Sequence, residues 1–404
     1  PEVAHVDCTR MLRNDTDYIK EIANHRPKIV PVNLGWSCAS IQDRILPARN
    51  PNTSFSIMYA KIVFTDYDFL EDQLATTYAS ENTYCFVMDS KASNTFNDRF
   101  LKLASCLPNV IVARRKFDLD SYGHNQNEAH LECMKVTRDR EWKYAVLLQN
   151  HDVMLKTHSE MTEILKIYGG ANEVETRHCI DDRCKSFERN MGKLQLCPRS
   201  LNGTELTKCK ATDIEWGKGW MQMMLSRAAV DYIIDEINII PLLRVTNSMV
   251  RADEQLYNTL QINPEIRLPG GFHHKCRKDP LYRFRLSRWS TTFESFDGLG
   301  KIWRALYATV TGHDSNCLSG RVRHELCIYG VEDLPTLVNS NSTIANKMLP
   351  EFDHAVTSCI SEMLFNRTRE GLSTIKRSLY ENIPVVRYHR ERNNPDFSIE
   401  KFEC

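Results

Sequence analysis

A regular alternation of apolar runs with amphipathic segments between residues 55 and 170 is the feature that most constrains the fold. Runs of strand length occur at Phe55–Phe64, Tyr84–Met88, Val110–Ala113 and Tyr144–Leu148. Segments with helical spacing follow these runs, at Phe69–Thr77, Arg99–Ser105, Glu128–Arg138 and Ser159–Tyr168. Strands that alternate with helices form a mostly parallel sheet that helices cover on both faces. The sequence therefore predicts an α/β fold.

The last of these helices also indicates where a ligand would bind. Thr157 and Glu160 have the spacing of a capping box, and apolar residues follow at helical spacing, at Met161, Ile164, Leu165 and Tyr168. Asp152 lies between the strand Tyr144–Leu148 and this helix. Open α/β sheets bind their ligands at the carboxyl ends of the strands. We therefore expect Asp152 at a binding edge.

The chain beyond residue 170 is less regular. Residues 171–212 are polar and rich in cysteine, which predicts an excursion over the site that disulfides hold. Ser226 is the expected N-cap of one helix, and another helix is expected to begin near Asp253. Residues 263–320 are loop-rich, and a strand at Leu326–Tyr329 and helical segments to about Arg377 follow. No internal repeat or low-complexity tract divides the chain, so we expect one compact unit.

The charge balance excludes several classes of partner. Lys and Arg together number 52, as do Asp and Glu, so no overall field attracts nucleic acid or a membrane surface. Any phosphate binding must therefore be local. No stretch approaches the ~18 apolar residues of a membrane-spanning helix. The chain begins at Pro1 with neither an initiator Met nor an apolar signal region, which suggests a processed form or one trimmed of its targeting segment.

The cysteines favour an oxidising compartment. Fourteen of them are spread over the whole chain, an even number that is typical of disulfides. The alternative is a zinc site at His178, Cys179 and Cys184, but these residues lack the paired C-x-x-C spacing of structural zinc. Sequons for N-glycosylation support the same compartment; they lie at Asn14, Asn52, Asn202, Asn341 and Asn366.

Five segments in order carry a resemblance to a known family. They read Asn82-Thr-Tyr-Cys-Phe-Val-Met-Asp, Glu141-Trp-Lys-Tyr-Ala-Val-Leu-Leu, Ala252-Asp-Glu-Gln-Leu, Cys327-Ile-Tyr-Gly-Val-Glu-Asp-Leu and Ala345-Asn-Lys. The chain thus resembles the core 2/I-branching β-1,6-N-acetylglucosaminyltransferases. The resemblance implies a GT-A-like, Rossmann-type sheet flanked by helices, with a loop-rich C-terminal part stapled by disulfides.

The same resemblance implies a domain organisation and a partial disulfide pattern. Residues 1–54 would form a stem-like segment tied to a single catalytic domain, which divides into a nucleotide-binding half (55–170) and a half for acceptor and diphosphate (171–404). The implied pairs are Cys8–Cys359, Cys38–Cys106, Cys85–Cys133 and Cys317–Cys327. Connectivity stays open for Cys179, Cys184, Cys197, Cys209, Cys276 and Cys404.

The resemblance assigns the catalytic base to Glu254. Inverting sugar transfer needs one carboxylate that removes the proton of the attacking hydroxyl. The plain structural alternative is that Asp253 and Glu254 are acidic residues in the first turn of a helix, where the helix dipole favours them.

Fixed cations would replace a metal at the leaving diphosphate. Lys347 matches one cation of the resembled family, and Arg323 matches the other. His324 and Arg321 are the alternatives for the second cation. We choose Arg323 because its guanidinium is permanently charged and can bind a diphosphate with two parallel hydrogen bonds. The competing hypothesis is a metal held by a D-x-D string. Such strings occur at Asp66 with Asp68 and at Asp118 with Asp120. Neither string matches a metal-binding element of the family, so no cofactor is expected.

Donor and acceptor positions follow from the same comparison. Asp89 and Tyr122 match the family's nucleoside pocket. The paired histidines of the family's first strand are missing, because this chain reads Met58-Tyr-Ala-Lys61 there. Three residues match the acceptor site of the family: Glu175, Arg183 and Trp303. The alternative for Trp303 is that its side chain belongs to the hydrophobic core.

The expected function is metal-independent transfer of N-acetylglucosamine from UDP-GlcNAc, in β-1,6 linkage, to a Gal-β-1,3-GalNAc O-glycan on a glycoprotein. The alternatives are the same chemistry with UDP-glucose or UDP-xylose, a glycan-binding protein without catalysis, and a glycoside hydrolase, which would need a second flanking carboxylate. The expected location is the Golgi lumen, with a membrane anchor outside this chain, or the extracellular space.

Overall fold

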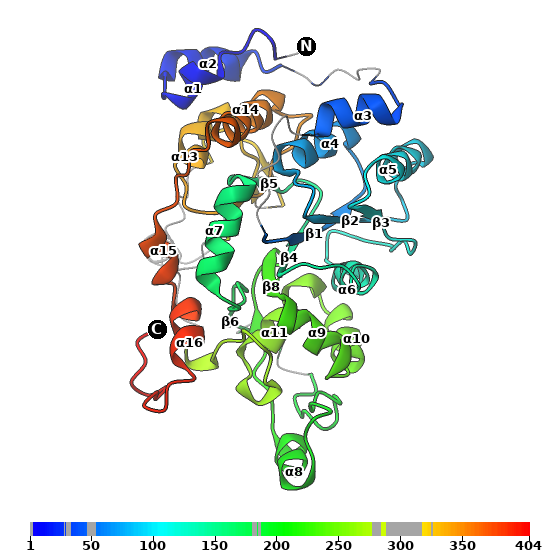
Figure 1. Ribbon diagram of the computed structural model, residues 1–404, viewed down its shortest axis with the longest axis vertical. Coiled ribbons are helices and arrows are strands. Elements are labelled where there is room, and N and C mark those ends of the chain that lie inside the picture. The colour runs from blue at the N-terminus through cyan, green and yellow to red at the C-terminus, as the bar shows by residue number, and fades with distance from the viewer. Residues whose placement is uncertain are drawn as a thin grey trace, which may run out of the picture.

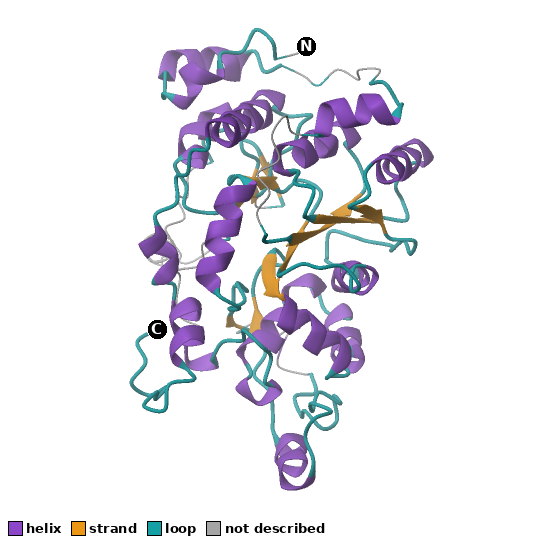
Figure 2. Ribbon diagram, viewed as in Figure 1, coloured by secondary structure: helices purple, strands orange, loops and turns teal. Residues whose placement is uncertain are grey.

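A five-stranded sheet forms the centre of the protein (Figures 1 and 2). Strand β1 (Ile57–Val63) pairs in parallel with β2 (Thr83–Met88) and β4 (Tyr144–Leu148). On the outer sides, β3 (Val110–Val112) continues the parallel sheet, and β8 (Met223–Ser226) pairs antiparallel with β4. The computed structural model describes residues 3–27, 29, 34–46, 54–179, 184, 187–276, 284–287, 317–324 and 326–404. The mostly parallel sheet that the sequence predicts is confirmed.

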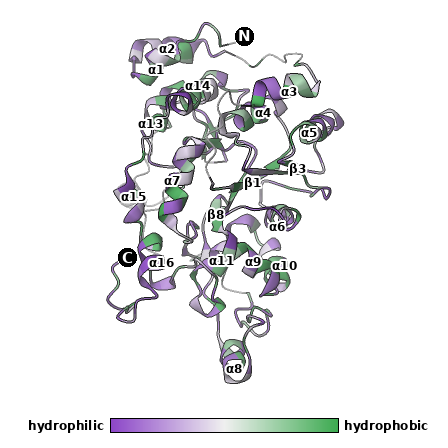
Figure 3. Cartoon of the chain, viewed as in Figure 1, coloured by the Kyte–Doolittle hydropathy of each residue, from purple (hydrophilic) through white to green (hydrophobic). Residues whose placement is uncertain are grey.

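Helices cover both faces of this sheet because alternate strand residues belong to two separate cores. Tyr59 and Val63 pack in a cluster with α4 (Tyr67–Thr77), α5 (Asn94–Cys106) and α7 (His158–Tyr168). Met58 and Ile62 point into the other cluster, which contains apolar residues of α6 (Gln126–Val136), α9 (Arg227–Asp235), α10 (Ile240–Asn247) and α11 (Leu256–Ile262). Figure 3 shows apolar residues concentrated on β1 and β8, while α7 and α10 carry both kinds. The side chains of β1, β2 and β4 are all buried, which explains their continuous apolar runs.

Two predicted helix starts are confirmed. The Thr157 hydroxyl accepts a hydrogen bond from the backbone N–H of Glu160 at 3.2 Å, and the Glu160 carboxylate accepts one from the N–H of Thr157 at 2.9 Å. The side chain of Ser226 accepts from the N–H of Ala229 and caps α9. Local capping chemistry therefore fixes where these helices begin.

Other boundaries differ from the prediction. The helix expected near Asp253 is a 3-10 turn, η2 (Ala252–Glu254), and α11 follows at Leu256. Arg251 adopts the left-handed conformation (φ 57°) before this turn, and the irregular backbone of Gln255 separates it from α11. The expectation that helices end near Arg377 was wrong, because α15 (Arg377–Glu381) and α16 (Pro384–Glu391) continue the chain. The strand expected at Leu326–Tyr329 is the shorter β11 (Leu326–Cys327), which pairs with β10 (Val322–Arg323).

The remaining elements are short or peripheral. The helices are α1 (Cys8–Leu12), α2 (Thr16–Asn24), α3 (Cys38–Ile45), α8 (Gly203–Ala211), α13 (Leu334–Val338) and α14 (His354–Glu370), with 3-10 turns η3 (Pro264–Ile266), η4 (His274–Cys276) and η5 (Val331–Asp333). The strands are β5 (Val153–Met154), β6 (Arg177–His178), β7 (Gly217–Lys218), β9 (Arg285–Leu286) and β12 (Ile344–Ala345). In Figure 1, α8 lies at the far end of the molecule from α1–α3. Within the described residues, no helix is long and apolar enough to cross a membrane.

All fourteen cysteines form disulfides. The four implied pairs are confirmed: Cys8–Cys359, Cys38–Cys106, Cys85–Cys133 and Cys317–Cys327. The connectivity left open resolves into Cys179–Cys184, Cys197–Cys209 and Cys276–Cys404. Two of these bridges staple the excursion 171–212, as expected. Because Cys179 and Cys184 are bonded to each other, they provide no thiolate pair for zinc.

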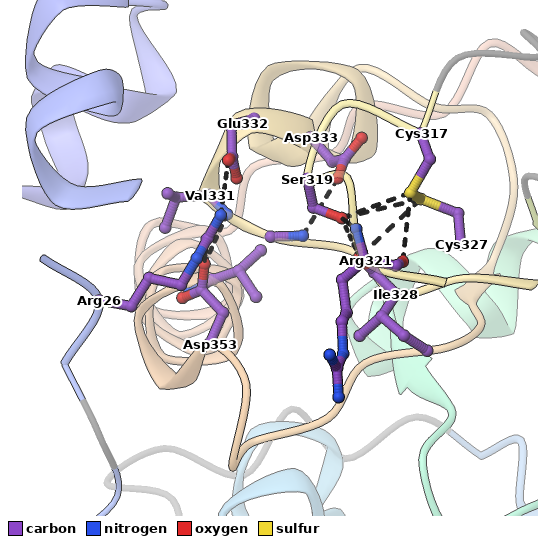
Figure 4. A network of polar contacts seen from close by, with 12 residues as sticks. Arg26, Cys317, Ser319, Arg321, Cys327, Ile328, Val331, Glu332, Asp333 and Asp353 are labelled. Carbon is purple, nitrogen blue, oxygen red and sulfur yellow. Dashed lines mark hydrogen bonds and ion pairs between the residues drawn. A yellow bond between two sulfur atoms is a disulfide. The ribbon is translucent and has the colours of Figure 1, made fainter. Parts of the chain in front are cut away.

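The N-terminal segment is fastened to the C-terminal helices. Besides Cys8–Cys359, which joins α1 to α14, Arg26 pairs with Glu332 at 2.6 Å and with the carboxylate of Asp353, which also accepts a hydrogen bond from Val331 N–H (Figure 4). Asp353 is fully buried and caps α14. Segments from the two ends of the chain are therefore held together by both covalent and ionic links.

Candidate active site

A second, three-stranded sheet gathers distant segments at the carboxyl end of β4. Its central strand β12 pairs with β5, which follows β4, and with β9. This pairing places Asp152, Arg285 and Asn346 next to one another, although Asp152 and Asn346 are 194 residues apart in the chain. The expectation that Asp152 lies at the carboxyl end of a buried strand is confirmed.

Asp152 is the centre of a buried polar network. Its carboxylate accepts hydrogen bonds from the backbone N–H of Gln149 and the side-chain amide of Asn346, both at 2.6 Å, and from the amide of Gln222 at 3.1 Å. Lys61 donates to the backbone carbonyl of Asp152 at 3.1 Å, and burial lowers the pKa of Lys61 to about 8. A buried carboxylate needs such partners because an uncompensated charge would be costly.

Arg285 connects this network to the predicted base, Glu254, and to the predicted acceptor-binding residue, Glu175. Its guanidinium donates to Gln222 at 2.7 Å and to Asn346 at 2.6 Å, and it lies 4.3 Å from the ring centre of Trp220. Burial lowers the pKa of Arg285, and the charges of Asp152, Glu175 and Glu254 oppose that shift. One partly buried cation therefore interacts electrostatically with three carboxylates. Sequence reasoning missed it because the loop-rich stretch 263–320 holds many basic residues and no local pattern singles one out.

The backbones of Glu254 and Glu175 both contact Gly219. The N–H of Gly219 donates to the carbonyl of Glu254 at 3.0 Å, and a Cβ at Gly219 would lie 1.9 Å from the carbonyl oxygen of Glu175. Only glycine permits this close approach. Burial raises the pKa of Glu175, Arg177 and Arg285 lower it, and Glu254 raises it, so the two carboxylates interact. The structure thus brings the predicted base and the predicted acceptor-binding glutamate together.

Asp253, beside the predicted base, is a carboxyl group with an unusually high pKa. Burial, followed by the charge of Glu254, raises its pKa to about 7. Its side chain occupies the space where a Cβ of Gly123 would be, and Gly123 has φ +85°. Asp253 therefore packs against the loop that contains Tyr122, whose carbonyl accepts from the N–H of Ala252 at 2.9 Å.

The predicted diphosphate cations are also neighbours. Lys347 is partly buried and directly follows Asn346. Burial lowers the pKa of Lys347, the charges of Arg323 and Arg285 lower it further, and Asp152 raises it. Arg323 is exposed on β10, so its guanidinium is open to a ligand.

The charge of Arg323 reaches Lys347, which distinguishes it from the alternatives Arg321 and His324. Neither alternative is among the groups that shift the pKa of Lys347. The side chain of Arg321 points away from the Cys317–Cys327 disulfide, and its carbonyl accepts from the N–H of Ile328 at 2.8 Å (Figure 4). His324 has a left-handed backbone (φ 50°). The disulfide closes the loop that presents Arg323.

The predicted donor residues lie near the carboxyl end of β2. Asp89 is buried, and its carboxylate accepts from the N–H of Lys91 at 2.9 Å. The ammonium group of Lys91 lies 3.4 Å from Asp89 and 2.5 Å from Asp118. Lys91 thereby ties Asp89 to the loop that leads to Tyr122, whose side chain is exposed. Arg183 and Trp303 lie outside the described residues.

Neither literal D-x-D string forms a paired metal motif. Asp68 binds Arg99 at 2.7 Å, whereas the Asp66 carboxylate lies 2.7 Å from His151. In the second string, Asp118 binds Lys91, and Asp120 accepts hydrogen bonds from His124 and from the N–H of Tyr122. The two aspartates of each string thus have separate partners.

Comparison with known proteins identifies relatives over most of the chain. The profile of the family described as Branch: Core-2/I-Branching enzyme matches residues 57–338. Human β-1,3-galactosyl-O-glycosyl-glycoprotein β-1,6-N-acetylglucosaminyltransferase is 26% identical over 391 residues, which cover 91% of this chain and 86% of that protein. A bovine herpesvirus 4 protein of the same name is 25% identical, and the match covers 92% of this chain and 85% of the viral protein. Cattle β-1,3-galactosyl-O-glycosyl-glycoprotein β-1,6-N-acetylglucosaminyltransferase 3 is 26% identical over 330 residues, which cover 80% of this chain and 71% of that protein.

An open α/β sheet with clustered carboxylates and cations at its carboxyl edge, in a chain with these relatives, defines a glycosyltransferase. The chain belongs to the core-2/I-branching enzyme family. The resemblance inferred from the five sequence segments is confirmed.

Proposed function

We propose that the protein is an inverting, metal-independent transferase that moves N-acetylglucosamine from UDP-GlcNAc, in β-1,6 linkage, to Gal-β-1,3-GalNAc O-glycans. The coarse part of this proposal is supported by relatives whose names specify a β-1,3-galactosyl-O-glycosyl-glycoprotein substrate and β-1,6-N-acetylglucosaminyl transfer. The seven disulfides support an oxidising compartment, and we propose the Golgi lumen.

The observation that carries the proposal is the position of Arg285. The same guanidinium interacts with Glu175 and Glu254 and donates to Asn346, which directly precedes Lys347. Carboxylates suited to an acceptor alcohol and cations suited to a diphosphate therefore belong to one connected site. A protein that only binds glycans has no need for a carboxylate base beside a diphosphate-binding cation pair.

In the proposed reaction, Glu254 accepts the proton of the acceptor 6-hydroxyl. At the same time, the oxygen of that hydroxyl forms a bond to the anomeric carbon of the donor sugar. The bond from the anomeric carbon to the diphosphate oxygen breaks on the opposite face, and UDP departs with the electron pair. Lys347 and Arg323 offset the negative charge that develops on the diphosphate, because fixed cations stabilise a leaving anion without reorganisation. Glu175 would orient the acceptor sugar.

The test is transfer with a panel of UDP-sugars, with and without EDTA, by wild type, Glu254→Gln and Glu205→Gln. Loss of a general base lowers the rate about 10²–10⁴-fold, so we expect that loss in Glu254→Gln only. Glu205 is the matched control, because it is a surface carboxylate on α8 that pairs with Arg267. Transfer of glucose or xylose in place of N-acetylglucosamine would change the donor assignment. Absence of turnover with every donor, or turnover that needs added manganese, would overturn the proposed mechanism.

A further inference from the structure

Asp66, His151 and Glu351 form a cluster that the proposed reaction does not use. They come from three separate segments: Asp66 follows β1, His151 follows β4, and Glu351 lies beyond β12. One potential ligand atom from each residue lies within 4.8 Å of the other two. The cluster thus combines an imidazole nitrogen with two carboxylate oxygens.

The imidazole of His151 is fixed by its surroundings. Its side chain is 6% exposed and packs against the rings of Phe64, edge to face at 6.0 Å, and Phe69 at 6.1 Å. Its Nε2 lies 2.7 Å from Oδ2 of Asp66. The backbone carbonyl of His151 accepts from the N–H of Met348 at 3.3 Å, which connects it to the segment that leads to Glu351. The ring is therefore oriented in advance toward the two carboxylates.

The carboxylate of Asp66 is directed to the cluster and away from its own helix. Asp66 is the N-cap residue of α4, where an aspartate usually accepts a backbone hydrogen bond, yet its side chain makes no such bond. Asp68, two residues later, forms the ion pair with Arg99 instead. The literal D-x-D string therefore supplies only one residue to the cluster.

No fixed cation neutralises these carboxylates among the described residues. Glu351 forms no ion pair there, and the only partner of the Asp66 carboxylate among the described residues is His151, which is charged only when protonated. Within the same part of the chain, Lys347 forms no ion pair with either carboxylate. Two carboxylates held this close favour a bound cation.

We propose that Asp66, His151 and Glu351 bind a divalent transition-metal ion, through Nε2 of His151 and one oxygen of each carboxylate, with water at the remaining positions. Mixed imidazole and carboxylate ligands suit zinc or manganese, whereas calcium and magnesium prefer oxygen ligands alone. Metal–ligand bonds of about 2.0–2.2 Å separate neighbouring ligand atoms by roughly 3–4 Å. Glu351 is exposed, so its side chain has room to close that distance.

This ion would hold together the loops after β1, β4 and β12 at the same edge of the sheet as Lys347. It is separate from the proposed transfer chemistry, whose base and cations are other residues. Binding to the folded state alone would raise the melting temperature by mass action. Transfer without added metal and metal binding at this cluster are therefore independent results.

The test is titration of the metal-stripped full chain with Zn²⁺, Mn²⁺, Mg²⁺ and Ca²⁺ by isothermal calorimetry, and with Co²⁺ by its visible absorption. We expect one saturable site for zinc or manganese, at least about 10-fold weaker in His151→Gln and in Glu351→Gln. The exposed position of Glu351 makes the second variant safe for folding. A matched control is His124→Gln, which removes the imidazole of another Asp–His pair (2.6 Å from Asp120) that belongs to no three-residue cluster among the described residues.

The expected thermal signature is a rise of a few degrees in Tm with saturating zinc in wild type and in His124→Gln, and no rise in Glu351→Gln. Three results would overturn the proposal: no saturable binding, binding of equal strength in the cluster variants, or binding that only His124→Gln abolishes. Transfer activity measured in parallel separates these results from a failure of the proposed function.

Discussion

Arg285 donates a 2.6 Å hydrogen bond to Asn346, the residue immediately before Lys347. The same guanidinium interacts with Glu175 and Glu254. Because Asn346 also donates to Asp152, a displacement of Arg285 would be felt at both the carboxylates and the cation. Arg285 is thus a positioning residue between the two halves of the proposed reaction.

Replacement of Arg285 tests this role. Arg285→Met removes the donors to the side-chain oxygens of Gln222 and Asn346, and an unsatisfied buried acceptor costs about 1–3 kcal/mol. Glu175 keeps its ion pair with Arg177 at 2.7 Å. Arg285→Lys keeps the charge but loses the planar fork that reaches Gln222 and Asn346 together. We expect lower stability in urea for the methionine variant, and a loss of kcat/KM of about 10-fold or more for both. Full activity of Arg285→Lys would show that charge alone suffices.

The Cys317–Cys327 disulfide is expected to affect donor binding more than stability. It closes a short loop, with a sequence separation of 10, that presents Arg323. The Cys197–Cys209 disulfide closes a loop of similar size, with a separation of 12, on the distant α8. Chain-entropy arguments give both bridges about 3 kcal/mol of stabilisation, so the paired serine variants should unfold at similar denaturant concentrations. Only the Cys317→Ser, Cys327→Ser variant should raise the KM for UDP-sugar, and equal KM values would contradict the assignment of Arg323.

The raised pKa of Asp253 predicts how stability depends on pH. The folded state keeps a proton up to about pH 7, whereas the unfolded chain releases it near pH 4. This contribution to stability is therefore fully present below about pH 4 and is lost as the pH rises toward 7. Asn keeps the shape of Asp253 but cannot ionise. The free energy of unfolding of Asp253→Asn should therefore exceed that of wild type by about 1–3 kcal/mol between pH 4.5 and 8. Urea unfolding of both proteins at several pH values measures this difference. If the two stabilities change with pH in the same way, Asp253 does not titrate with a raised pKa.

The central sheet was predictable because its signals are local. The runs at Tyr84–Met88 and Tyr144–Leu148 are continuous and apolar, and they become β2 and β4 within one residue of the predicted limits. The capping residues Thr157 and Ser226 are also local, and each fixes the start of its helix. The turn at Asp253 was not predictable in this way, because the left-handed conformation of Arg251 gives no clear signal in the sequence.

The site itself was only partly predictable. Glu254, Lys347 and Arg323 are candidates that their motifs single out, and Glu175 is a candidate through the same resemblance. Arg285 has no such motif, because its role comes from partners in distant parts of the chain that only the β5–β12–β9 sheet brings together. Asp66, His151 and Glu351 likewise come from three strand ends that tertiary structure alone assembles.

The coupling between Arg323 and Lys347 makes a prediction about alkaline pH. Burial, and after it the charge of Arg323, lower the pKa of Lys347, so the ammonium group loses its proton at a lower pH than an ordinary lysine. Donor binding should weaken as that charge is lost, which places an alkaline limb in the pH profile of kcat/KM for UDP-sugar. Arg323→Gln removes a neighbouring positive charge, so the pKa of Lys347 rises and the limb moves to higher pH even though affinity falls. Lys347→Arg keeps its charge throughout and should abolish the limb. A limb at the same pH in all three proteins would show that another group titrates there and that Lys347 does not bind the diphosphate.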